Sequence, residues 1–164
     1  MGEEQVYIQV LKDSLMEKQK IINALIEATT EQSQVLKSDS SKEVICDVIM
    51  EKVSQKEELL KRLEHNDRGF EKVYRRLRQT FLDEKETYHS EIVILQEMIK
   101  KIADDSVKLE ALERKNKEAV DLFLKKEHER MKNFKLVREN SKQYYQHMSN
   151  KHQIGQTYFV DHKQ

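Results

Sequence analysis

The hydrophobic positions near the N-terminus recur at alternating steps of three and four residues. The apolar members of this first stripe are Ile8, Leu11, Leu15, Ile22, Leu25 and Leu36, and the remaining steps are occupied by Lys18, Thr29 and Gln32. A second flank of apolar residues consists of Val10, Ile21, Ile26 and Val35. This heptad pattern is typical of a long helix that packs along one face. It predicts a helix over about residues 3–37, with Glu3 and Glu4 at the end where the helix dipole favours negative charge.

The polar segment 38–41 interrupts the pattern. Ser40 and Glu43 fit a capping box, in which each side chain accepts a hydrogen bond from the other residue's backbone N–H. A second stripe follows: Ile45, Val48, Ile49, Leu59, Leu60, Leu63, Phe70, Tyr74, Leu77 and Phe81. The stripe passes through Gly69 unchanged, although a glycine inside a helix costs about 1 kcal/mol relative to alanine. The pattern therefore predicts a second helix over about residues 40–86, with Gly69 inside it.

The third stripe is the longest. It comprises Tyr88, Ile92, Leu95, Ile99, Ile102, Leu109, Leu112, Val120, Phe123, Phe134, Val137, Tyr144 and Met148. Neither glycine nor proline marks the end of the second helix, and both Thr87 and the segment 104–106 are candidate boundaries. An uninterrupted helix from Ser41 to Met148 would be about 160 Å long. We therefore expect the chain to fold back, with a third helix over about residues 88–148.

These patterns predict an all-α fold of long antiparallel helices that form an elongated, coiled-coil-like bundle of about three helices. The bundle spans residues 1–148, and a flexible C-terminal tail spans 149–164. Composition agrees, because charged and hydrophobic residues each make up 37% of the chain, which leaves narrow apolar stripes rather than a thick core. With no proline and three glycines, the chain also lacks the turn residues that hairpins need.

Charge and cysteine content indicate which partners and which cellular compartment suit the chain. The 30 basic and 30 acidic side chains cancel, so no overall field attracts nucleic acid or membrane. The single cysteine, Cys46, cannot form an internal disulfide and suits a reducing compartment. No segment approaches the roughly 20 apolar residues of a membrane span, and the acidic N-terminus lacks a signal peptide pattern. We expect a soluble, cytoplasmic protein without membrane insertion.

The sequence gives no sign of an enzyme. The sequence contains no glycine-rich phosphate-binding motif. The acidic residues are distributed over every exposed helix face, whereas a catalytic pair would need to lie in a cleft. His147 and His152 are five residues apart, whereas two zinc ligands on one helix face are three or four apart. We interpret Cys46 as a small apolar residue. We therefore expect no catalytic residues, no cofactor and no metal.

Two basic stretches allow three interpretations. The first contains Arg68, Lys72, Arg75, Arg76 and Arg78, and the second contains Lys125, Lys126, Arg130, Lys132, Lys135 and Arg138. Both stretches could bind an acidic protein. Both could also bind nucleic acid, since phosphate neutralisation only requires lysine and arginine on one face. Glu71 and Glu127, with other glutamates, interleave with them. The favoured interpretation is a solvated or salt-bridged helix face, and no nucleic-acid partner is expected.

Large and adaptable side chains accumulate towards the C-terminus. Such residues anchor partner helices in grooves. The predicted partner-binding residues are Phe134, Val137, Tyr144, Tyr145, Met148, Tyr158 and Phe159. For Phe123 and Phe134 a role inside the bundle is an equally good interpretation, whereas residues at or beyond the end of the bundle are harder to explain as core.

Several segments resemble the FlgN family of flagellar export chaperones. The stretch 56–63, with the sequence KEELLKRL, and the stretch 69–77 are similar to segments of that family. The end of the chain, 158–163, is similar to the family's YFxDxK-like signature, with His162 where the family has lysine. The resemblance implies a small cytosolic helical chaperone of the flagellar type III secretion system. Such chaperones bind the C-terminal helices of hook-filament junction proteins through their C-terminal part and deliver these clients to the export apparatus.

Two other functions remain open at this point. The heptad stripes would also suit a structural coiled-coil adaptor or scaffold unrelated to flagella, including a homodimer. A helical nucleic-acid binder that uses the face from Arg68 to Arg78 is the less favoured alternative.

Overall fold

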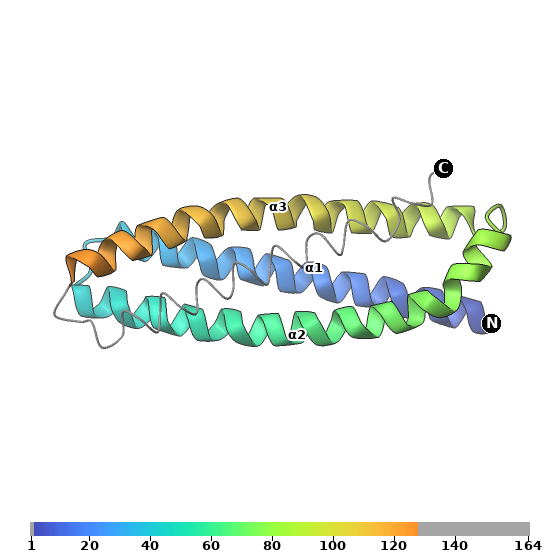
Figure 1. Ribbon diagram of the computed structural model, residues 1–164, viewed down its shortest axis with the longest axis horizontal. Coiled ribbons are helices and arrows are strands. Elements are labelled where there is room, and N and C mark those ends of the chain that lie inside the picture. Colours follow the sequence, from blue (N-terminus) through green and yellow to red (C-terminus); the bar gives the residue numbers. More distant parts are fainter. Residues whose placement is uncertain (1, 128–164) are drawn as a thin grey trace.

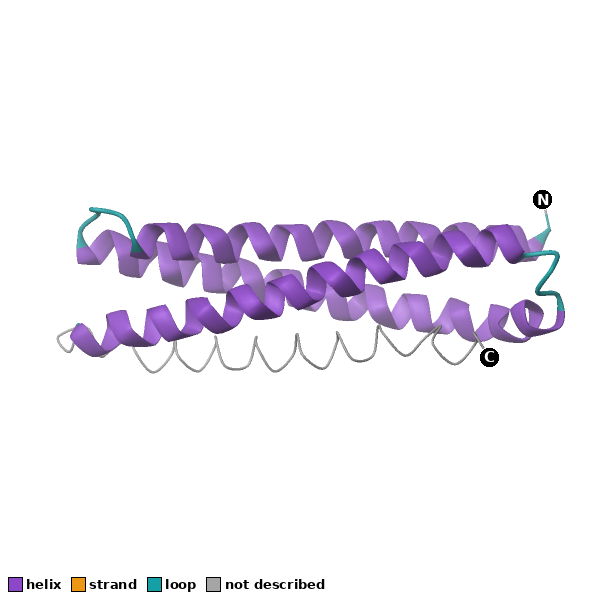
Figure 2. Cartoon of the chain, turned by 90° about the horizontal axis from the view of Figure 1, so that it is seen from above, coloured by secondary structure: helices purple, strands orange, loops and turns teal. Residues whose placement is uncertain are grey.

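The computed structural model describes residues 2–127, which form three long helices. These are α1 (Glu3–Leu36), α2 (Lys42–Asp83) and α3 (His89–Lys126). They lie side by side along the long axis of an elongated bundle (Figure 1), and the turns between them lie at opposite ends (Figure 2). α1 packs against both other helices, whereas α2 and α3 contact each other less. The predicted all-α bundle is confirmed.

The turn between α1 and α2 differs slightly from the prediction. Ser41, rather than Ser40, caps α2, because its hydroxyl accepts a hydrogen bond of 3.3 Å from the N–H of Val44. Ser38 lies in the turn and hydrogen-bonds within it. Its hydroxyl donates to the carbonyl of Val35 at 2.7 Å and accepts from the N–H of Ser40 at 3.3 Å. The second helix therefore begins at Lys42 and not at residue 40.

The boundary between the second and third helices lies at the first of its two candidate positions. α2 ends at Asp83 and α3 begins at His89, so Thr87 is in the turn and the segment 104–106 is inside α3. Ser106 is buried there, and its hydroxyl donates to the carbonyl of Ile102 at 2.8 Å. A serine that satisfies its hydroxyl within the helix in this way is no helix stop.

The third helix ends earlier than predicted. α3 stops at Lys126, and Glu127 leaves the helical conformation with φ −108° and ψ 56°. The Glu127 carboxylate lies 2.7 Å from Nζ of Lys42 at the start of α2, and its side chain is only 9% exposed. This ion pair joins the end of α3 to the neighbouring helix. A single helix over 88–148 is therefore wrong, and residues 128–148 lie outside the described part of the chain.

The predicted stripes form the interior of the bundle, which divides into two apolar clusters. The larger cluster contains Ile8, Leu11, Leu15, Ile21, Ile22, Leu25, Leu60, Leu63, Phe70, Tyr74, Leu77, Phe81, Leu95, Ile102 and Leu109. The smaller cluster contains Ile45, Ile49, Val53, Val120 and Leu124. Val10, predicted to widen the first stripe, is instead 41% exposed. Gly69 lies within α2, as predicted, with open space around its Cα.

Candidate functional site

The predicted partner-binding residues lie outside the described part of the chain. This applies to Phe134, Val137, Tyr144, Tyr145, Met148, Tyr158 and Phe159. Within residues 2–127, two features stand out from an ordinary helical bundle. One is a buried layer of polar side chains, and the other is a surface groove with apolar and basic residues.

The buried layer separates the two apolar clusters. Its members come from all three helices and are at most 4% exposed: Thr29 and Gln32 from α1, Lys56 from α2, and Glu113 and Asn116 from α3. We call this set the polar layer. Thr29 and Gln32 were predicted to occupy steps of the first stripe, and their burial confirms it. Lys56, Glu113 and Asn116 were missed, although each falls on the three-four repeat of its own helix.

Lys56 is at the centre of the polar layer. Its Nζ donates to Oε1 of Glu113 and to Oε1 of Gln32, both at 2.6 Å. Gln32 Oε1 also accepts from Nδ2 of Asn116 at 2.9 Å, and the hydroxyl of Thr29 hydrogen-bonds to Glu113. Burial lowers the pKa of Lys56, and the adjacent Glu113 carboxylate acts in the opposite direction. The ammonium group is therefore buried together with the carboxylate that compensates it.

This arrangement favours one alignment of the three helices. Removing one partner of a buried ion pair typically costs about 3–5 kcal/mol, because the other charge stays buried without compensation. A shift of α3 along α1 would separate Glu113 from Lys56 and incur a similar cost. The polar layer thus holds the helices in register, and its groups are too buried to meet a substrate.

Further polar contacts join α1 to its neighbours closer to the N-terminus. Lys18 and Asp67 form an ion pair of 3.0 Å between α1 and α2. On the α3 side, Asp105 accepts from Nζ of Lys101 and from Nε2 of Gln19, each at 2.8 Å. The hydrogen bond from Lys101 is the largest cause that lowers the pKa of Asp105, against the effect of its burial.

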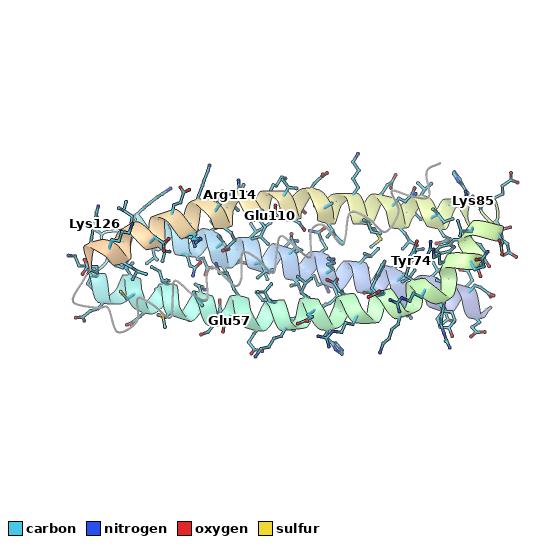
Figure 3. The ribbon with its side chains drawn as sticks, viewed as in Figure 1. Glu57, Tyr74, Lys85, Glu110, Arg114 and Lys126 are labelled. Atoms are coloured by element: carbon cyan, nitrogen blue, oxygen red, sulfur yellow. The ribbon has the colours of Figure 1, made fainter. Side chains whose placement is uncertain are left out.

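The surface groove lies between α1 and α3, near the end of the bundle that holds the smaller cluster. We call it the α1–α3 groove. Its volume is about 600 Å³, and its lining comprises the apolar Leu36, Leu112, Ala119, Leu122 and Phe123, the basic Lys37, Lys115 and Lys126, and the polar Thr30, Ser33 and Gln34. Leu122 is 56% exposed, the highest value among the large hydrophobic residues of the described chain. Figure 3 shows Lys126 at this end of the bundle.

Two other depressions differ in character. The hollow between α1 and α2 contains four glutamates, and its basic residues already form ion pairs, Lys52 with Glu31 and Arg62 with Glu17. The pocket between α2 and α3 holds only about 200 Å³ and lies at the opposite end, beside Phe81. The α1–α3 groove is therefore the most suitable of these surfaces for an apolar ligand.

The first basic stretch behaves largely as a salt-bridged helix face. Arg68 pairs with Glu64 at 2.8 Å and Arg75 with Glu71 at 2.6 Å, each one turn apart on α2. Arg76 stacks over the ring of Tyr7, with its guanidinium carbon 5.3 Å from the ring centroid. These contacts favour the interpretation of that stretch as a salt-bridged helix face over a surface for an acidic protein or nucleic acid.

Within residues 2–127, no group of three or more His, Cys, Asp or Glu side chains is placed to hold a metal ion. None of the helices described here is long and apolar enough to cross a membrane. Comparison with protein-family models, curated proteins and solved structures finds no match to this chain.

Proposed function

We propose that this protein is a cytoplasmic export chaperone of the FlgN type. It binds a C-terminal helix of a hook-filament junction protein, keeps this client unassembled and hands it to the export apparatus. The observation that carries the proposal is the α1–α3 groove, an apolar depression on the surface of a bundle held in register by the polar layer. Grooves of this kind accept the apolar face of an amphipathic helix.

The segments that resemble the family have separable roles in this proposal. The stretch 56–63 supplies Lys56 to the polar layer and Leu60 and Leu63 to the larger cluster. The stretch 69–77 likewise supplies buried Phe70, Tyr74 and Leu77. Both segments therefore contribute residues to the core of the bundle. The terminal signature, outside the described residues, supports the resemblance in function.

The proposed mechanism is binding alone, with no catalytic step and no cofactor. A client helix that would otherwise assemble packs its apolar face against the chaperone. Charged residues around the contact set the orientation and the association rate more than the affinity. Release at the export apparatus then requires only a component that competes with the chaperone for the client helix, or with the client helix for the chaperone surface.

The proposal is tested by the effect of the chain on client assembly. A hook-filament junction protein from the same organism is mixed with the full-length chain, or with a variant that lacks residues 149–164, and assembly is followed by light scattering. We expect the full chain to suppress assembly at about equimolar ratio and the shortened chain to do so less well. A melting curve of each chain by circular dichroism controls for folding. Unaltered assembly in the presence of the full chain would contradict the proposal.

A structural coiled-coil adaptor is the second candidate function. It is favoured by Val6 and Val10, which lie one turn apart on α1 and are 50% and 41% exposed. Such a pair could pack against a second copy of the chain. Sedimentation equilibrium would then show a dimer that dissociates in the double variant Val6→Ser/Val10→Ser, whereas a monomer at all concentrations would exclude this adaptor.

A further inference from the structure

The α1–α3 groove has a one-sided charge. Lys37, Lys115 and Lys126 line it, and no carboxylate does, in a chain whose acidic and basic residues are equal in number. Within residues 2–127 none of these three lysines takes part in an ion pair, as is also true of other exposed lysines such as Lys20 and Lys72. The groove therefore presents basic groups that the described bundle does not use.

The helix dipole explains only part of this charge. Lys37 and Lys126 lie at the C-terminal ends of α1 and α3, where a positive charge is favourable within the last turn. Lys115 lies about three turns before the end of α3, too far for this effect. The helix dipole therefore does not account for Lys115 beside the apolar groove.

The lining residues that α3 contributes to the groove lie on one face of this helix. Lys115, Ala119, Leu122 and Lys126 are spaced at i, i+4, i+7 and i+11 on α3 and so share one face. Leu122 extends into solvent, and the neighbouring Phe123 is half-buried against the smaller cluster. The groove thus has an apolar floor with basic groups at both of its helical walls.

We propose that the α1–α3 groove binds an amphipathic helix whose apolar stripe is flanked by glutamate or aspartate. The apolar stripe covers Leu122 and Phe123, and the carboxylates pair with Lys37, Lys115 and Lys126. This inference rests on the proposed function, because it takes the groove as the surface that receives the helix, and it adds the charge of the partner. A basic helix would place like charges together, and a nucleic acid would leave Leu122 uncovered.

The test uses the full-length chain and a fluorescein-labelled synthetic peptide. The peptide carries leucines at i, i+3, i+4 and i+7 with glutamates on both flanks, and a matched peptide carries glutamine in place of each glutamate. Fluorescence anisotropy is measured at low and at physiological salt. We expect the acidic peptide to bind about tenfold or more tightly than the glutamine peptide, with the difference reduced by salt. Equal affinities for the two peptides, or no binding of the acidic one, would overturn the inference.

Matched variants locate the binding. Lys115→Glu should weaken the acidic peptide about tenfold, whereas Lys100→Glu, which reverses an exposed lysine elsewhere on α3, should change its affinity less than about twofold. Leu122→Ala should also weaken binding, in contrast to Met16→Ala, which truncates a side chain of similar exposure, 53% against 56%. Both members of each pair replace exposed residues, so folding is preserved. Equal effects within each pair would place the peptide elsewhere and overturn the inference.

The two proposals fail in different ways. If the client segment binds and Lys115→Glu weakens it, both hold. If the client segment binds equally well to Lys115→Glu and Leu122→Ala, the proposed function stands and the groove inference is overturned. If the acidic peptide binds in the groove but no junction-protein segment does, the groove inference stands and the flagellar assignment is wrong. A second copy of the chain as the occupant would appear as a dimer dissociated by Leu122→Ala, and this too would overturn the inference.

Discussion

The two apolar clusters of the bundle are built on the same heptad repeat but differ in size. Among residues 2–127, the larger contains fifteen buried residues and the smaller contains five, which come from the start of α2 and the end of α3. The polar layer lies between them on α2 and α3, and on α1 it follows the last residues of the larger cluster. Because local opening costs least where few apolar contacts are lost, we expect the end with the smaller cluster to open more easily, as judged from residues 2–127. The α1–α3 groove lies at this end, so the stable part of the bundle supports the fold and the less stable part carries the proposed binding surface.

The largest expected effect comes from breaking the polar layer. Glu113→Leu leaves the Lys56 ammonium buried without its carboxylate and should destabilise the protein by about 3–5 kcal/mol. The double variant Lys56→Met/Glu113→Leu removes both charges and should recover most or all of that loss. Urea unfolding followed by circular dichroism measures both. A double variant no more stable than the single one would show that the ion pair is not what the layer requires.

The same truncation in each cluster compares them directly. Leu25→Ala in the larger cluster should cost about 2–5 kcal/mol, since a buried leucine is fully surrounded there. Leu124→Ala in the smaller cluster should cost about 2 kcal/mol or less, because the end of the bundle can close around the missing atoms. Both side chains are at most 3% exposed, so they are matched in burial. Equal losses in urea unfolding would contradict the difference between the clusters.

A stabilising change is expected on the side of the larger cluster. Gly69 is helical and exposed, and a Cβ added to it would meet nothing within 4 Å. Gly69→Ala should therefore raise the free energy of unfolding by about 1 kcal/mol, through the greater helix propensity of alanine. Thermal unfolding by circular dichroism is sufficient to detect it. A lower melting temperature would show that the position is not an ordinary exposed helix site.

The smallest effect concerns acid stability. The pKa of Asp105 is lowered from its ordinary value of 3.8, chiefly by the hydrogen bond from Lys101. Its stabilising contribution is therefore present above the unfolded-state pKa and is lost as the pH falls through the folded-state pKa. Asp105→Asn should reduce stability at neutral pH by less than about 1 kcal/mol and flatten the acid loss. Asp104→Asn, at the exposed neighbouring position, is the control, and an equal change in that variant would refute the role of Asp105.

Periodicity was enough to predict the fold but not the ends of its helices. The stripes of α1 and α2 place the buried residues well because a heptad repeat leaves little choice of face. The turn at Glu84–Tyr88 was uncertain and the end of α3 at Lys126 was not predicted, since neither is marked by glycine or proline. The ion pair of Lys42 with Glu127 at the end of α3 joins residues that are far apart in the sequence.

The candidate site was harder to predict for a related reason. Lys56 lies in a strongly charged stretch, which by itself suggests an exposed residue. Its burial depends on hydrogen bonds to Gln32 of α1 and Glu113 of α3, which the spacing within α2 does not show. Lys115 and Leu122 belong to one face of α3, but the groove also needs Leu36 and Lys37 from α1. Sequence spacing shows the faces of single helices, and it does not show which faces remain uncovered after packing.

The central claim is that the protein binds a client helix. Calorimetric titration of the full-length chain with the C-terminal helical segment of a hook-filament junction protein from the same organism tests it most directly. The account predicts one-to-one binding at micromolar affinity or tighter, about −8 kcal/mol or more favourable. Absence of heat together with absence of co-elution would contradict the chaperone assignment and leave a helical bundle whose partner is of another kind.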